Sequence, residues 1–239
     1  MTDNMMGLFL SECLPSEVPT TFFCTQRYSE LAKRRNAEIA LHPVLDHTHD
    51  WKSITEGMIA DIGSTEGVSG IRAHSCAYQQ KYGVLLSELG LHYVSQVTLP
   101  FECEVEPFMH PWGIWEIPIR YMDNMDMWAS ERSGLTARKF SVKVLEAAIS
   151  SKTPFCFDFH PVHILLNTSC MEDYARWAEA GRPEISALAR NRNYGVRDYF
   201  NDLLQLAADA NAEFSTCRDI LGSIGPNGEA GRRVACASA

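Results

Sequence analysis

The sequence predicts an α/β fold in which parallel strands alternate with helices, either as a barrel or as a doubly wound sheet. Two observations carry this prediction. Short runs of β-branched and aromatic residues recur along the chain, and segments with helical spacing of apolar residues separate them. With 239 residues, of which 46% are hydrophobic and 21% charged, the chain can bury one sizeable core.

The composition argues against several classes of protein. A formal charge of −9 without a block of Lys and Arg is unlike a nucleic-acid binder. No apolar run reaches the ~20 residues needed to span a bilayer. Because residues 1–7 lack the basic region of a signal peptide and the eight cysteines form no CxxC pair, we expect a cytoplasmic protein with reduced thiols.

The first half of the chain alternates regularly between the two kinds of segment. Pro43 ends one strand, because proline has no N–H for a sheet ladder, and Gly90 is typical of the residue after a helix. The expected strands are residues 18–24, 37–42, 70–73 and 93–96, and the expected helices are residues 4–14, 26–35, 54–66 and 79–89.

The second half begins with an irregular stretch, residues 99–113, which contains three prolines. The expected strands are then residues 115–119, 154–159 and 213–216, and the expected helices are residues 139–150, 171–180 and 196–210. This gives about six or seven parallel strands. We expect residues 1–223 to form one domain and residues 224–239, rich in Gly, Ala and Ser, to form a flexible tail.

Reactive side chains follow three of the expected strands. His42 follows the second, Arg72 and His74 stand at the end of the third, and His160 comes directly after residues 154–159. In α/β folds the active site gathers at the carboxyl ends of parallel strands. We therefore expect His42, Arg72 and His160 to meet in one cleft.

The segment at residues 42–50 suits a metal site, because it holds three histidines and two aspartates. Neutral imidazole and carboxylate together favour Zn²⁺ or another divalent transition metal. We interpret His42 as a ligand, and Asp46, four residues later, could approach the same metal. His47 and His49 are more simply explained as solvated side chains of a polar loop.

His160 and His163 are candidates for proton transfer, since the ordinary pKa of histidine lies near neutral pH. Their alternative is a core histidine bonded to a backbone carbonyl. Asp158 can orient a neighbouring histidine. Arg72 either pairs with a catalytic carboxylate or belongs to an ordinary ion pair, and His74 points to the same side as Arg72 by strand alternation.

A substrate cleft could be lined by the tryptophans and by residues 122–128. Aromatic faces stack on sugar rings, which makes Trp115 a candidate substrate-binding residue. The other candidates are Asp123, from residues 122–128, and His163. Plain core packing is the alternative for the aromatic side chains.

Five segments in order resemble polysaccharide deacetylases of the NodB-homology superfamily, closest to a bacterial branch tied to surface-polysaccharide synthesis. The likeness runs over residues 3–220. The segments are PTTFFC at 19–24, EIALHP at 38–43, GIRAHS at 70–75, IWEIPI at 114–119 and FDFHPVH at 157–163.

The resemblance implies a distorted (β/α) barrel and a divalent metal, zinc or otherwise cobalt or nickel, held by an Asp and two His. In that family an early Asp is the base and a His on a late strand protonates the leaving amine. By position, His42 matches the first metal histidine, Arg72 the arginine of the third motif, and His160 the late-strand histidine.

Two departures from the family pattern shape the expected site. The family's first strand, with its Asp motif, precedes the helix that comes before residue 18. Either Asp3 stands in for that motif as the base, or the first strand is missing from this sequence. The second motif has Asp46 where the family has its second histidine, so we expect His42, Asp46 and His74 as the metal ligands.

The predicted function is metal-dependent N-deacetylation of an N-acetylated sugar or glycan in polysaccharide biosynthesis, with His160, Arg72 and Asp3 as catalytic residues. The alternative is a non-catalytic barrel that binds a glycan or a partner protein and has lost the first motif. An amidase acting on a non-sugar substrate has the same sequence signature.

Overall fold

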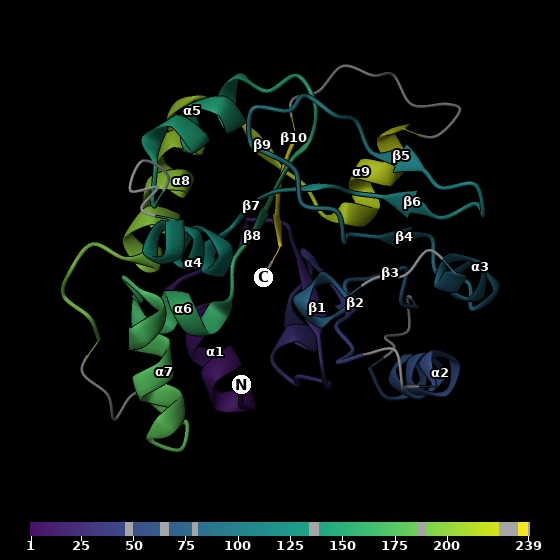
Figure 1. Ribbon diagram of the computed structural model, residues 1–239, viewed down its shortest axis with the longest axis horizontal. Helices are drawn as coiled ribbons and strands as arrows, with labels where there is room; N and C mark the ends of the chain where they lie inside the picture. The colour runs from purple at the N-terminus through teal and green to yellow at the C-terminus, as the bar shows by residue number, and fades with distance from the viewer. Residues whose placement is uncertain are drawn as a thin grey trace.

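The computed structural model describes residues 1–45, 50–62, 67–77, 81–133, 139–185, 190–224 and 234–238. Its strands form one sheet in the order β5-β6-β4-β3-β2-β1-β10-β8-β7, with β9 beside β10 (Figure 1). Neighbours are parallel except β5 and β6, which are antiparallel. The strands are β1 (Thr20–Cys24), β2 (Ala37–Leu41), β3 (Gly70–Ile71), β4 (Tyr93–Val94), β5 (Phe108–Met109), β6 (Trp115–Glu116), β7 (Ile119–Met122), β8 (Phe155–Asp158), β9 (Glu213–Phe214) and β10 (Val234–Ser238).

The α/β class with a mostly parallel sheet is confirmed, but the strand pairing does not show the closed barrel that we expected. The path of strands has two ends, β5 and β7. β6 pairs with β4, whereas β7 pairs with β8. Pro118 lies between β6 and β7 in the sequence, and a proline interrupts the hydrogen-bond ladder of a sheet because it has no N–H. An isolated parallel bridge between Thr98 and Ile119 is the contact that joins these two parts of the sheet.

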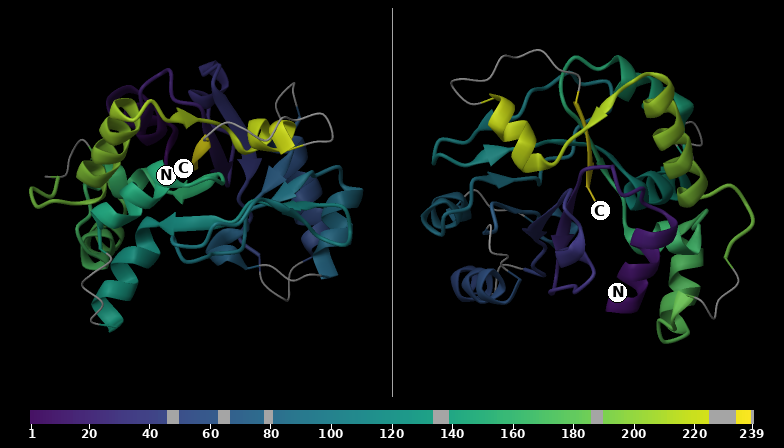
Figure 2. Two further views of the ribbon diagram at one scale, coloured as in Figure 1. Left: turned by 90° about the horizontal axis from the view of Figure 1, so that it is seen from above. Right: turned by 180° about the vertical axis from the view of Figure 1, so that it is seen from behind.

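The helices lie on both sides of the strands, with α1 and α4 to α8 on one side and α2 and α3 on the other (Figures 1 and 2). None of the helices in the described ranges is long and apolar enough to cross a membrane. The helices are α1 (Asp3–Glu12), α2 (Trp51–Ile62), α3 (Lys81–Glu88), α4 (Asp123–Ser133), α5 (Val142–Ser150), α6 (Pro161–Leu166), α7 (Met171–Glu179), α8 (Val196–Asp209) and α9 (Cys217–Ile224), with short 3₁₀ turns η1 (Leu31–Lys33) and η2 (His74–Cys76).

The C-terminal segment differs from the flexible tail that we expected over residues 224–239. Residues 234–238 form β10, which is parallel to β1 on one side and to β8 on the other. The composition of small residues suggested a frayed end, but a strand between two others needs only backbone donors and acceptors, which small residues provide equally well.

The expected helix over residues 26–35 is reduced to the single turn η1. The backbone N–H and the hydroxyl of Ser29 both donate to the carboxylate of Asp3. The segment before η1 is therefore bonded to α1 through Asp3.

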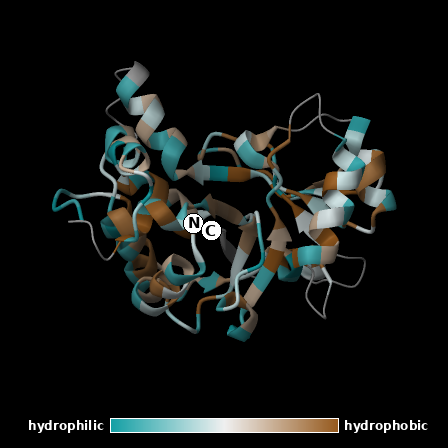
Figure 3. Ribbon diagram, turned by 90° about the horizontal axis from the view of Figure 1, so that it is seen from below, coloured by the Kyte–Doolittle hydropathy of each residue, from teal (hydrophilic) through white to brown (hydrophobic). Residues whose placement is uncertain are grey.

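The core forms where the apolar faces of the strands meet the helices, and Figure 3 shows hydrophobic residues concentrated on these elements. Strand alternation directs Phe155 and Phe157 to one face, where their ring centroids are 4.7 Å apart. Phe157 stacks on Phe159, and the Tyr121 ring lies 5.6 Å from Phe157. The other face of β8 is thereby left for polar side chains.

At the amino-terminal ends of the strands, the buried carboxylate of Glu38 gathers several donors. It accepts hydrogen bonds from Thr21 Oγ1 at 2.8 Å, Ser69 Oγ at 2.7 Å and Tyr93 Oη at 3.0 Å. The backbone N–H of Arg218 in α9 donates to the same carboxylate at 3.0 Å. These bonds join β1, β2, β4 and α9 at the amino-terminal ends of the strands, whereas His42 and Arg72 follow the carboxyl-terminal ends.

Gly70→Ala should destabilise the protein because of a clash inside this network. A Cβ at Gly70 would lie 1.9 Å from the Tyr93 ring, whereas a Cβ at Gly57, in α2, would meet nothing within 4 Å. We expect Gly70→Ala to lower the free energy of unfolding by at least 1–3 kcal/mol, roughly the cost of overpacking a core. Gly57→Ala, the matched control, should raise it by about 1 kcal/mol through helix propensity. Urea denaturation followed by circular dichroism measures both, and equal effects would contradict the packing around Tyr93.

Candidate active site

Arg72 and Asp158 form a buried ion pair between the carboxyl ends of β3 and β8. Arg72 Nη1 lies 2.8 Å from Asp158 Oδ1, and Arg72 is only 2% exposed. Its Nε donates to the carbonyl of Ser95, just past β4, and its Nη2 donates to Ser95 Oγ at 2.7 Å. Burial opposes the charge of Arg72, but the neighbouring Asp158 raises the pKa of the guanidinium above its ordinary value.

His160 and Asp123 form a second pair at the same edge of the sheet. Asp123 is the first residue of α4, directly after β7, and is fully buried. Its Oδ1 accepts from His160 Nδ1 at 2.6 Å, and its Oδ2 accepts from the backbone N–H of His160 at 2.8 Å. These two bonds fix the orientation of the imidazole and leave Nε2 free to face other groups.

The charge of Asp123 determines the protonation of His160. Burial alone would lower the pKa of His160, but the Asp123 carboxylate and its hydrogen bond outweigh burial and raise this pKa to about 9. The pKa of Asp123 is lowered in turn: burial would raise it, and the positive charge of His160 more than offsets that effect. At neutral pH the pair is therefore an imidazolium and a carboxylate.

His163 lies in α6, three residues after His160, and its ring stands 5.3 Å from the His160 ring. It is 3% exposed, and its Nδ1 is 3.0 Å from Thr168 Oγ1. Burial lowers the pKa of His163 to about 4, so its imidazole is neutral. One ligand atom each from Asp123, His160 and His163 lie within 4.8 Å of one another, a spacing that could hold a metal ion.

The hydrogen bonding of this trio favours proton transfer over metal binding. Both oxygens of Asp123 are engaged by His160. A metal between Asp123 and His160 Nδ1 would have to displace the proton that joins them, since a ligating imidazole nitrogen must be deprotonated. The raised pKa of His160 opposes that loss.

A second group that could contribute to a metal site is the pair of imidazoles His42 and His74. His42 directly follows β2, and His74 follows the neighbouring β3. His42 Nε2 is 3.4 Å from His74 Nδ1. Two nitrogens bound about 2.05 Å from one tetrahedral zinc stand about 3.3 Å apart, so the spacing fits a shared metal.

The state of His42 also fits a ligand. Burial first, and then the charges of His160, Arg72 and His74, lower the pKa of His42 to about 3. The imidazole is therefore neutral, as metal binding requires. The second nitrogen of His42, Nδ1, is buried and finds no hydrogen-bond partner in the part of the chain that the structure describes.

Trp115, expected to bind substrate, lies at the other edge of the sheet. It opens β6 opposite Tyr93, the first residue of β4. It lines a cavity of its own with Ser69 and His92, which precede β3 and β4. His42 and Arg72 follow the opposite ends of their strands, because parallel strands begin at one edge and end at the other. The structure therefore does not bring Trp115 to them.

The structure places one of the two other carboxylates predicted for the site, Asp3, whereas the second, Asp46, is not described. Asp3 lies in the first turn of α1, where its two oxygens accept from the N–H and hydroxyl of Ser29. Its carboxylate thus ties a helix start to the loop after β1, and the expectation that it acts as the base has no support in these contacts. Asp46 lies outside the described residues, as do His47 and His49.

Asp123 and His163, expected to bind substrate, lie in the interior of the protein. Both side chains are buried and bonded to neighbours, Asp123 to His160 and His163 to Thr168. The Asp123–His160 pair is not among the sequence-based expectations, although a signal for it is present: Asp123 directly follows an extended segment, as His160 does. The interpretation of residues 122–128 as a cleft lining overlooks that α4 begins at Asp123.

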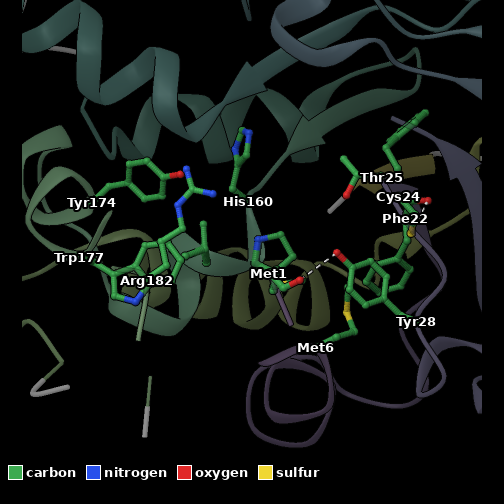
Figure 4. A pocket seen from close by; sticks show the side chains of 13 residues that line it. Met1, Met6, Phe22, Cys24, Thr25, Tyr28, His160, Tyr174, Trp177 and Arg182 are labelled. Atoms are coloured by element: carbon green, nitrogen blue, oxygen red, sulfur yellow. Dashed lines mark hydrogen bonds between the residues drawn. The ribbon is translucent and has the colours of Figure 1, made fainter. Parts of the chain in front are cut away.

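A cavity of about 180 Å³ opens beside His160 (Figure 4). Side chains from β1, the loop after it, α7 and the turn that follows α7 line it. Nothing in the sequence analysis pointed to α7 or its turn. The lining includes Phe22, Tyr28, His160, Tyr174, Trp177 and Arg182.

Comparison with known proteins identifies the family. The family model described as WbmS-like polysaccharide deacetylase matches residues 1–178. The structure is similar to the crystal structure of a protein from Bordetella bronchiseptica, described as a candidate polysaccharide deacetylase involved in O-antigen biosynthesis. That match has a TM-score of 0.64 and 18% identity and covers 86% of this chain and 83% of the other. Curated protein sequences give no match. On the evidence of the family model, which spans most of the sequence, this chain belongs to the WbmS-like polysaccharide deacetylases.

Proposed function

We propose that this protein is a metal-dependent N-deacetylase that hydrolyses the acetamide group of an N-acetylated sugar or glycan in the synthesis of a surface polysaccharide. Family membership supports deacetylation, and the O-antigen role in the description of the Bordetella protein supports the substrate class. The observation that carries the proposal is the placement of a carboxylate-bound imidazolium, His160, at the same sheet edge as the His42–His74 pair.

His42 and His74 are the residues that would hold the metal, with Asp46 proposed as a further ligand. The two nitrogens have the spacing of zinc ligands, and His42 is held neutral by burial. When bound, a divalent cation supplies Lewis acidity that polarises the acetamide carbonyl and activates water.

His160 supplies the proton that the reaction consumes. The amide nitrogen leaves poorly as an anion, so the C–N bond breaks readily only when that nitrogen is protonated. His160 donates from Nε2, while Nδ1 stays bonded to Asp123. Asp123 is a positioning residue, because it is buried and acts through His160.

A carboxylate must accept the proton of the attacking water. Asp158 precedes His160 by two residues, on the same face of β8 by alternation, and is held by Arg72 at 2.8 Å. Asp46 is the other candidate for this role. Arg72 keeps a fixed positive charge beside the site in either case.

Metal content should separate the two imidazole groups. His42→Ala and His74→Ala should each reduce bound zinc well below one ion per chain, because catalytic zinc sites rely on about three protein ligands. His160→Ala should retain the metal. Elemental analysis after incubation with Zn²⁺ and gel filtration measures this. Loss of the ion in His160→Ala with retention in His42→Ala would instead place the metal at Asp123, His160 and His163.

Acetate release from N-acetylated oligosaccharides tests the function itself. We expect metal-loaded protein to release acetate and His160→Asn to lower kcat by roughly 10²–10⁴, the usual contribution of general acid–base catalysis. His92→Asn is the matched control, since His92 lies at the opposite edge of the sheet. Glycan binding without acetate release by metal-loaded protein would favour the non-catalytic alternative.

Asp123→Asn should shift the pH dependence of activity. With Asp123 present, the pKa of His160 is about 9, so the acid form persists until the pH rises through that value. Without the Asp123 carboxylate only Asp158 still opposes the effect of burial on the His160 pKa, and we expect the alkaline limit to fall well below 9. Activity at pH 8 relative to pH 6 should therefore collapse in Asp123→Asn but not in Glu131→Gln, an exposed position on the same helix. An unchanged profile would contradict the role of Asp123.

A further inference from the structure

The cavity beside His160 is lined by that side chain and by residues from another part of the chain, the loop after β1, α7 and the turn after α7. The aromatic side chains Tyr28, Tyr174 and Trp177 line it. Its volume of about 180 Å³ corresponds to about six water molecules at roughly 30 Å³ each. Such a space accommodates a single sugar unit, and aromatic faces provide the flat apolar surface on which a sugar ring stacks.

Two cationic side chains line this cavity, the Arg182 guanidinium and the His160 imidazolium. Arg182 carries the permanent charge of the two, and none of the lining residues that the structure describes is Asp or Glu. In the view of Figure 4 its guanidinium lies between the Tyr174 and His160 rings. The chain as a whole has a formal net charge of −9, which repels anions on average. Arg182 makes this cavity a local exception, where an anionic ligand is attracted.

The turn that carries Arg182 is held in place by Trp177. The backbone N–H of Arg182 donates to the Trp177 carbonyl at 3.1 Å, and Trp177 Nε1 donates to the Pro183 carbonyl at 2.9 Å. The guanidinium is therefore presented from a fixed turn.

The backbone of Arg182 is strained. Its φ is 54°, directly after Gly181 at 84°. The left-handed region favours glycine and costs free energy for other residues. Neither the turn nor the core requires an arginine at this position, so a side-chain role in the cavity accounts for it better than a role in folding.

We propose that Arg182 binds the oxyanion of an acidic sugar, so that the substrate is an N-acetylated sugar bearing a carboxylate or a phosphate and not a neutral one. This proposal rests on the proposed function for the N-acetyl group. The planar guanidinium fork matches both kinds of oxyanion, and the neighbouring rings hold the sugar while His160 faces the same cavity.

Binding measurements test this without requiring turnover. We would titrate the full chain, with and without Zn²⁺, with N-acetylglucosamine, its uronic acid and its 6-phosphate, using calorimetry. At least one acidic sugar should bind roughly ten- to a hundredfold more tightly than the neutral one, the range expected for a charge-assisted contact. Which acid binds more tightly identifies the source of the oxyanion. Arg182→Gln should abolish the preference, Arg182→Lys should retain part of it, and Arg192→Gln, an exposed charge-matched control outside the cavity, should leave it unchanged.

Arg182→Gly serves as a second variant, because glycine adopts the positive φ freely. It should retain the thermal midpoint and lose the preference. Equal binding of neutral and acidic sugars by the wild type, no measurable binding of any of the three, or a preference that survives Arg182→Gln would each overturn the proposal. Tight, Arg182-dependent binding of an acidic sugar whose acetyl group is never released would uphold the cavity assignment and refute the proposed function.

Discussion

The buried ion pair of Arg72 and Asp158 is the interaction on which the site depends. It joins β3 to β8 from within the sheet, and the bonds of Arg72 to Ser95 extend the connection to the end of β4. His74 follows Arg72 by two residues, and His160 follows Asp158 by two. The ion pair therefore holds together the two strand ends from which these histidines extend, while Asp123 orients the His160 ring. Removing one partner would leave a buried charge uncompensated, a loss of about 3–5 kcal/mol.

Stability and chemistry are placed at opposite edges of the sheet. At the amino-terminal ends of the strands, the Glu38 carboxylate accepts hydrogen bonds from hydroxyl and backbone donors of several elements, and these bonds hold the elements together. At the carboxyl ends of the strands two imidazoles have opposite shifts: the pKa of His42 is lowered to about 3, and that of His160 is raised to about 9. A site needs such contrast, because a ligand must be neutral and a proton donor must be charged.

The α/β class and most strand positions could be predicted because both are written in local patterns. Local patterns identified β1, β2, β3 and β8, and the residues after the last three led to His42, Arg72 and His160. What failed depended on contacts between distant segments. The helix expected over residues 26–35 is a single turn, η1, and the segment before it is bonded to the distant Asp3, a contact that no local pattern reports. The Asp123–His160 bond likewise joins residues from two separate strand ends.

The same limit explains why the Trp177–Arg182 turn and the cavity beside it were not predicted. A pocket is a property of surfaces that meet in space, and its lining here comes from β1, α7 and residues around His160. Trp115 shows the same limit: its aromatic side chain suits sugar binding, but the sequence does not reveal that it opens β6, at the strand ends opposite those that bear His42 and Arg72.

The position of β10 between β1 and β8 has a consequence for folding during synthesis. Residue 20 of β1 pairs with residue 237, and residue 155 of β8 pairs with residue 235, so the strand between them is translated after both. Chains grow at about 5–20 residues per second, and earlier segments begin to fold as they emerge. Until residues 234–238 leave the ribosome, β1 and β8 face each other across an unfilled position with open backbone donors and acceptors. During that interval the unpaired backbone groups of β1 and β8 can bond to a strand of another protein. Chaperones that cover exposed strands would protect the nascent chain most at this stage.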